Sequence, residues 1–163
     1  YSSHAEGNGT TASGDYSHAE GQGTTASGYS SHAEGNGTTA SGDYSHAEGQ
    51  GTTASGYFSH AEGWSTIASS SVQHVQGRGN IEDSAGRYAH IVGNGSSTGA
   101  TRSNAHTLDW DGLGWFAGGL KVGGTGQDDA EAKEVALKDD IPSMDAIYAE
   151  IVKRLPVAEG ASY

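Results

Sequence analysis

The chain has 163 residues, among them 27 glycines, two prolines and no cysteine, and only 33% of its residues are hydrophobic. The missing cysteines exclude a disulfide framework and a thiolate zinc site. The formal net charge of −12 argues against sequence-independent binding of nucleic acid or of an anionic membrane. No apolar run approaches the roughly 18 residues of a transmembrane helix, so no membrane insertion is expected.

The first part of the chain is a 14-residue repeat. The pentapeptide Ser-His-Ala-Glu-Gly begins at positions 3, 17, 31, 45 and 59, and it alternates with Thr-Thr-Ala-Ser-Gly, which begins at positions 10, 24, 38 and 52. Residues 1–28 and 29–56 are identical. A fixed short period is typical of stacked structural units rather than of a globular core.

Each repeat is expected to form one coil of a parallel β-solenoid. Its glycines exclude a stable helix and leave two short strands separated by turns. Because alternate strand residues face opposite sides, Ser3 and Ala5 are predicted to point into the coil, with histidine and glutamate outside. In the second strand Ala12 is predicted inside, and Thr11 and Ser13 outside. Stacking about 4.8 Å apart then places like residues over like residues.

The repeat pattern loosens after residue 71. Residues 72–77 keep the 14-residue step, whereas residues 88–93 and 104–108 follow at steps of 16. All eight histidines then fall at one register position. We therefore expect one repeat body of about eight coils over residues 1–107, with strict repeats over 1–71 and degenerate ones over 72–107.

The last third of the chain no longer follows the repeat and contains two of the three tryptophans. Asp111-Gly112 between two segments with tryptophan predicts a β-hairpin within a hairpin and turn region over residues 108–126. A strand is expected over 120–122. Residues 127–163 are predicted to be an acidic linker and a short helix that opens at Pro142-Ser143 and stops at Pro156.

The stacked glutamates need a partner, because residues 1–71 contain seven acidic residues and no lysine or arginine. The histidine two positions earlier shares their face, so we expect a structural His–Glu ladder, buried between chains, with raised histidine pKa values and greatest stability at mildly acidic pH. A metal site of histidines from three chains is the less favoured alternative, and no catalytic residue, resident metal or cofactor is assigned. The ladder comprises His4, Glu6, His18, Glu20, His32, Glu34, His46, Glu48, His60, Glu62, His74, His90 and His106.

The inter-strand loops are the candidate receptor contacts. They carry amides and aromatic residues at repeating positions, and amphipathic loop aromatics suit contact with glycan or protein. The alternative is that these side chains cap the coils or fill grooves between chains. The candidates are Asn8, Tyr16, Gln22, Tyr29, Asn36, Tyr44, Gln50, Tyr57, Phe58 and Trp64.

The Ser-x-Ala-x-Gly strand at this period, followed by Thr-Ala-x-Gly, resembles the head repeat of YadA-type trimeric autotransporter adhesins. The resemblance covers about residues 1–107 and implies a homotrimeric, left-handed parallel β-roll, although histidine and glutamate replace that family's valine and isoleucine. Residues 80–83, 88–95, 103–118 and 135–142 resemble C-terminal portions of phage and prophage tail-fibre or tail-spike proteins instead.

These resemblances imply a structural and receptor-binding protein, the distal part of a phage or prophage tail fibre, located in the virion or outside the cell. The expected partners are two further copies of the chain and a host-surface glycan or protein. The alternative is the head of a bacterial surface adhesin. An ice-binding solenoid with a threonine and serine row, and a self-cleaving chaperone, are weaker alternatives; Lys138 lacks the Ser-Asp-x-x-x-Lys context of the latter. The chain is thus expected not to be an enzyme.

Overall fold

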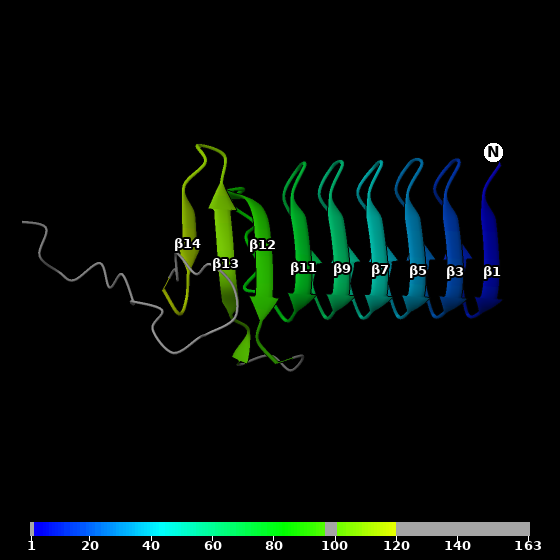
Figure 1. Cartoon of the computed structure of the whole chain (residues 1–163). Coiled ribbons are helices and arrows are strands. Elements are labelled where there is room, and N and C mark those ends of the chain that lie inside the picture. The colour runs from blue at the N-terminus through cyan, green and yellow to red at the C-terminus, as the bar shows by residue number, and fades with distance from the viewer. Residues whose placement is uncertain (1, 97–100, 120–163) are drawn as a thin grey trace, which may run out of the picture. The chain divides into compact units, whose positions relative to one another are not determined.

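A computed structural model describes residues 2–96 and 101–119, which form an all-β structure (Figure 1). A nine-stranded sheet holds the longer strands and a five-stranded sheet the two-residue strands. The large sheet comprises β1 (His4–Asn8), β3 (His18–Gln22), β5 (His32–Asn36), β7 (His46–Gln50), β9 (His60–Trp64), β11 (His74–Arg78), β12 (Tyr88–Asn94), β13 (Asn104–Asp109) and β14 (Gly114–Phe116). The small sheet comprises β2 (Thr11–Ala12), β4 (Thr25–Ala26), β6 (Thr39–Ala40), β8 (Thr53–Ala54) and β10 (Ile67–Ala68).

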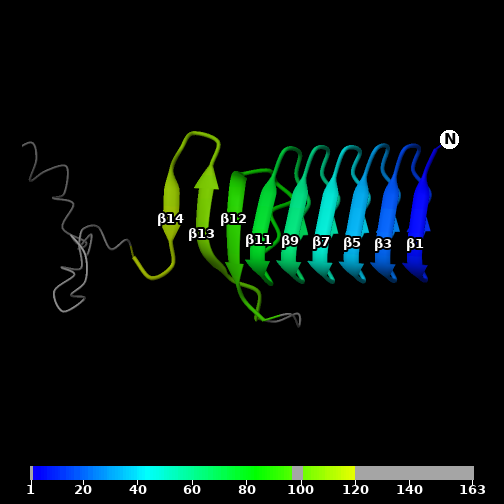
Figure 2. The same ribbon diagram turned by 45° about the vertical axis from the view of Figure 1, so that its right-hand side comes forward.

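The repeats stack as parallel coils, which confirms the predicted β-solenoid. The coils from β1 to β10 each contribute one strand to each sheet, and strand residues pair with their equivalents 14 positions on, as in His18 with His32. About six such coils follow one another from β1 to β11, as the side-by-side strands in Figure 2 show. The repeat length therefore sets the register of both sheets.

Alanine fills most of the narrow interior. Among the described residues, the buried apolar ones are eight alanines, Val75 and Ile91, and all are fully shielded from solvent. Ser17, Ser31, Ser45 and Ser59 are also buried, and each hydroxyl donates to a carbonyl in the preceding turn, as Ser45 Oγ does to Gly42 O at 2.6 Å. Ser3 and Ala5 are exposed, because the first coil has a neighbouring coil on one side only. The predicted inward face is confirmed, and its small side chains keep the two sheets close together.

Each long strand needs its glycine because the backbone of the next coil lies directly against it. Gly35 has a φ of 109°, which L side chains rarely adopt. A Cβ on Gly35 would overlap the carbonyl oxygen of Gly49 directly beside it. The Ser-His-Ala-Glu-Gly motif thus ends in glycine because the stacked backbones leave no room for a side chain.

The parallel stack ends one strand earlier than the sequence predicts. β12 pairs in parallel with β11, but β13 runs antiparallel to β12, so the expected eighth coil at residues 104–108 is wrong. The chain reverses direction after β12, because Asn94 N and Ser96 N donate to the carbonyls of Ser103 and Thr101 and form a hairpin. Figure 1 shows the opposed arrows of β12 and β13.

Side chains replace the missing coil at this end of the small sheet. The side chain of Asn80, fully buried, accepts from Ile67 N at 2.8 Å and donates to Ile67 O at 3.0 Å, as a further strand would. Arg102 donates to the carbonyls of Ser65 and Asn80 at 2.8 and 3.0 Å. These contacts satisfy backbone groups that would otherwise be left unpaired.

The predicted hairpin at Asp111-Gly112 is confirmed, since β13 and β14 pair antiparallel around it. The predicted strand over 120–122, the acidic linker and the C-terminal helix lie outside the described residues. Within the described ranges, no helix is long and apolar enough to cross a membrane.

Candidate functional surfaces of the roll

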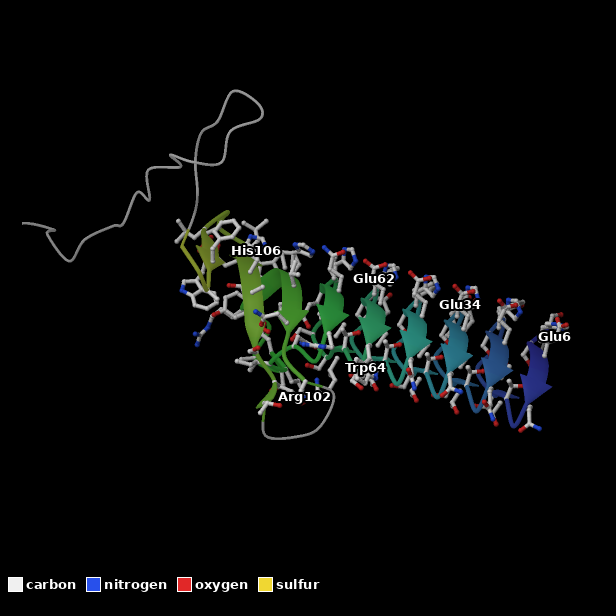
Figure 3. All side chains as sticks on the ribbon, turned by 60° about the horizontal axis from the view of Figure 1, so that its bottom comes forward. Glu6, Glu34, Glu62, Trp64, Arg102 and His106 are labelled. Carbon is white, nitrogen blue, oxygen red and sulfur yellow. The ribbon has the colours of Figure 1, made fainter. Side chains whose placement is uncertain are left out.

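The histidines form one continuous row on the outer face of the large sheet. From His18 to His74 the rings of successive coils stack nearly parallel, with centroids 4.7–4.9 Å apart and interplanar angles of 6–9°. The row continues through His90 to His106. His106 belongs to the antiparallel strand β13, where it pairs with Val92 of β12. Figure 3 shows Glu6, Glu34, Glu62 and His106 along one side of the sheet.

The glutamates form a second row beside the histidines, and the pairing between the rows changes along the roll. In the first coils each histidine faces the glutamate of its own strand, as His18 does Glu20 at 3.7 Å and His32 does Glu34 at 3.9 Å. From Glu48 onward each glutamate faces the histidine of the next coil, at 3.5 Å from Glu48 to His60. Five His–Glu pairs of the expected ladder thus form within the described part of a single chain, and its place between chains stays a prediction.

The change of pairing leaves His46 without an ion-pair partner. Glu34 faces His32 and Glu48 faces His60, so neither carboxylate comes within 4.0 Å of a ring nitrogen of His46. Its Nε2 atom is buried and makes no hydrogen bond. The same holds for four ladder histidines that do have an ion-pair partner, namely His18, His32, His60 and His74. His46 is thus the one irregular position in the strict part of the ladder.

The pKa values of two ladder histidines are shifted opposite to the expectation. Burial lowers the pKa of His46 from its ordinary value, and the neighbouring His60 and His32 lower it further, against a smaller opposing effect of the carboxylates. Burial, His74 and His106 lower the pKa of His90 in the same way. The predicted rise in histidine pKa is wrong at these two positions, because burial of the ring and then the neighbouring histidines disfavour the charged form more than the carboxylates favour it.

The aromatic candidates form a ridge at the turns that precede the long strands. Tyr29 contacts Tyr16 and Tyr44 with ring centroids 5.6 and 5.4 Å apart, and Tyr44 stacks on Phe58 at 4.8 Å. We call Tyr16, Tyr29, Tyr44, Tyr57 and Phe58 the aromatic ridge. Each of these side chains is 41–55% exposed, so none serves the core.

Backbone conformation sets the ridge apart from an ordinary surface. Tyr16, Tyr44 and Phe58 have φ values of 60°, 57° and 56°, in the left-handed region that glycine and asparagine usually occupy. Ser30 and Val72 take the same position in other coils, with φ values of 50° and 59°. Bulky residues retained in a strained conformation point to a role for the side chain itself.

The amide candidates form an exposed row at the other end of the long strands. Asn8, Gln22, Asn36 and Gln50 lie in register, and Asn36 Nδ2 donates to Gln22 Oε1 at 2.9 Å. Trp64 continues the row, and the Arg78 guanidinium lies 5.9 Å from its ring centroid. The structure therefore brings the predicted loop residues together as two separate rows.

A pocket near β12–β14 was missed by sequence reasoning. It has a volume of about 520 Å³ and is lined by Ile81, Tyr88, Asn94, Ser103, Asn104, Thr107, Trp115 and Ala117. No lining side chain is charged. Its residues come from segments brought together by the antiparallel strands, and the only sequence signal was the cluster of aromatic residues around the hairpin.

Comparison of the chain with family models, curated proteins and solved structures finds no match. The family resemblance drawn from the repeat motif therefore remains a prediction.

Proposed function

We propose that this chain is a structural and receptor-binding rod that works as a homotrimer, in the distal part of a phage or prophage tail fibre. The observation that carries the proposal is the aromatic ridge. Its rings repeat along consecutive coils and stay exposed, and three of its residues have a left-handed backbone conformation. A row of closely spaced rings suits a repetitive surface ligand such as a host glycan.

The composition of the core supports assembly with other copies. In residues 2–96 and 101–119, eight of the ten buried apolar residues are alanines, each of which removes little apolar surface from water. On the outer face, the side chains of the four ion pairs from His18–Glu20 to His74–Glu62 remain 33–44% exposed in a single chain. Packing of this face against other copies would bury further surface and give the inter-chain ladder expected from the sequence.

Light scattering of the full chain at pH 5.5 and pH 8 tests the assembly. We expect a mass of three times 16.6 kDa at both values. Dissociation at one pH alone would still support a trimer and would place ionisable groups in its interface. A monomer at both pH values would contradict the proposal.

Receptor binding is tested with labelled chain on a panel of whole bacterial cells. Replacing Tyr44 and Phe58 with alanine should reduce binding to a susceptible strain by at least about tenfold, since each buried aromatic contact contributes on the order of 1 kcal/mol. The matched control replaces the exposed Ser27 and Ser41, which lie in the same turns as Tyr29 and Tyr44 but carry no ring, and should bind like the wild type.

Two outcomes of the same assay would count against the fibre. Equal binding by both double variants would rule out the ridge as the receptor surface. Binding to animal matrix proteins but to no bacterial cell would favour the second candidate, a bacterial adhesin head, which the resemblance of the coil repeat supports.

A further inference from the structure

The irregular position in the ladder has the chemistry of a metal site. His46 on β7 lies between Glu34 on β5 and Glu48 on its own strand. One ring nitrogen and one oxygen from each carboxylate lie within 4.8 Å of one another. His32 and His60 already lie within 4.0 Å of these carboxylates, whereas neither carboxylate forms an ion pair with His46.

The ring of His46 is held in place by its neighbours. It stacks between His32 and His60, with ring centroids 4.7 Å away on either side and interplanar angles of 7° and 9°. The stack fixes the plane of the imidazole, while its buried Nε2 makes no hydrogen bond. A ligand atom oriented in this way needs little reorganisation to bind an ion.

The charge around this position also favours a cation. Residues 1–71 supply seven acidic side chains and no lysine or arginine. Glu20, Glu34, Glu48 and Glu62 pair residue by residue on consecutive strands, so their carboxylates repel one another. A divalent ion would offset that repulsion where no protein cation can.

We infer that Glu34, His46 and Glu48 bind a divalent transition-metal ion of the Zn²⁺ class. One imidazole and two carboxylates suit zinc and its neighbours, whereas Ca²⁺ and Mg²⁺ prefer oxygen ligands alone. With three protein ligands, a water completes a tetrahedral site.

The same arrangement recurs one coil further on. Glu48, His60 and Glu62 also place their ligand atoms within 4.8 Å of one another. Glu48 belongs to both groups, and within the described ranges no other group of this kind occurs. Glu48 would therefore bridge two ions if both groups are filled. This inference does not depend on the proposed trimeric tail fibre, since all the ligands come from one chain.

The test is a calorimetric titration of ZnCl₂ into the full chain, expressed without a histidine tag and freed of metal with EDTA. We expect one or two ions per chain and a higher melting temperature in the presence of zinc. Co²⁺ should give the visible absorption of a tetrahedral site with a nitrogen ligand.

Glu48→Gln is the decisive variant, because it removes a ligand from both groups and keeps the side-chain shape. We expect it to bind zinc at least about tenfold more weakly. Glu6→Gln is the matched control, since Glu6 has the same motif and lies outside both groups; it should bind like the wild type. Circular dichroism of the metal-free proteins checks that both variants fold.

Either of two results would overturn the inference. The first is that the wild type shows no binding tighter than about 0.1 mM. The second is that the two variants lose affinity equally, which would indicate diffuse attraction of cations by the acidic face.

Discussion

At the scale of single residues, the space between stacked backbones decides which side chains the repeat accepts. Gly35 and Gly37 both have positive φ values, 109° and 63°. They differ in their surroundings, because a Cβ on Gly35 would overlap Gly49 O whereas nothing lies within 4 Å of one on Gly37. Alanine substitutions at Gly35 and Gly37 therefore separate the loss of stability from backbone strain from the loss caused by a steric clash.

We expect Gly35→Ala to lower the free energy of unfolding by about 3 kcal/mol, since strain and overpacking add. Gly37→Ala should cost about 1 kcal/mol, from backbone strain alone. Urea denaturation of the two variants measures both values. Equal losses would mean that the coils separate freely enough to admit a methyl group.

The lowered pKa of His90 gives a second prediction at this scale. Nε2 of His90 lies 3.2 Å from the amide nitrogen of Gln76, which can only donate, so the ring accepts and is neutral. The groups that act on His90 are His74 and His106, which disfavour its charge, and Glu62, which favours it.

A histidine with a lowered pKa in the folded state stabilises the fold fully above its unfolded value, near 6.5, and loses that contribution as pH falls below it. The melting temperature in EDTA should therefore fall from pH 7.5 to pH 5.5. His90→Gln should reduce that fall. A melting temperature that rises toward pH 5.5 would instead support the ladder expected from the sequence, with raised pKa values.

At the scale of elements, the roll depends on the closure of its ends. β10 has a neighbouring strand on one side only, and Asn80 replaces the other neighbour with its amide group. The carbonyl of Asn80 is in turn held by Arg102. The Asn80 side chain thus pairs with the last strand of the small sheet, β10, at the level where the large sheet continues into β12.

Asn80→Ala should lower the free energy of unfolding by about 1–3 kcal/mol, because it leaves buried backbone groups of Ile67 unpaired. Asn36→Ala is the control, an exposed asparagine in a regular coil, and should change stability by less than about 0.5 kcal/mol. Guanidinium denaturation compares the two. A similar loss in both would show that the end of the small sheet is not closed by Asn80.

At the scale of the whole molecule, identical coils should be interchangeable. Residues 29–56 repeat residues 1–28, and Tyr57 follows Gly56 as Tyr29 follows Gly28. Removing 29–56 should therefore preserve every register and leave a folded roll that is shorter by two coils. Removing 29–49, which is one and a half repeats, should destroy the fold.

Circular dichroism and thermal melting of the two deletions distinguish these outcomes. The 28-residue deletion should keep the β spectrum and a cooperative transition, and the 21-residue deletion should lose both. Two folded deletions would mean that the coils tolerate a change of register.

The sequence alone predicted which histidines and glutamates line up in the ladder, but not which of them pair or how their pKa values shift. Period and alternation placed His18 over His32 and Ala19 inside, because a strand has a fixed two-residue alternation. They did not predict the change of pairing at His46, which depends on side-chain rotamers. The aromatic ridge was recognised as a set of loop residues, but its left-handed backbone was not.

The 14-residue period by itself determined the parallel coils, their register and the alanine interior, because identical units that stack in register repeat every local contact. Only the tertiary structure decided where the stack stops. The 16-residue steps at residues 88–93 and 104–108 suit either another coil or a reversal, and backbone hydrogen bonds between residues 94–96 and 101–103 select the reversal. The caps at Asn80 and Arg102 and the pocket beside Trp115 follow from that choice, since they join residues far apart in the chain.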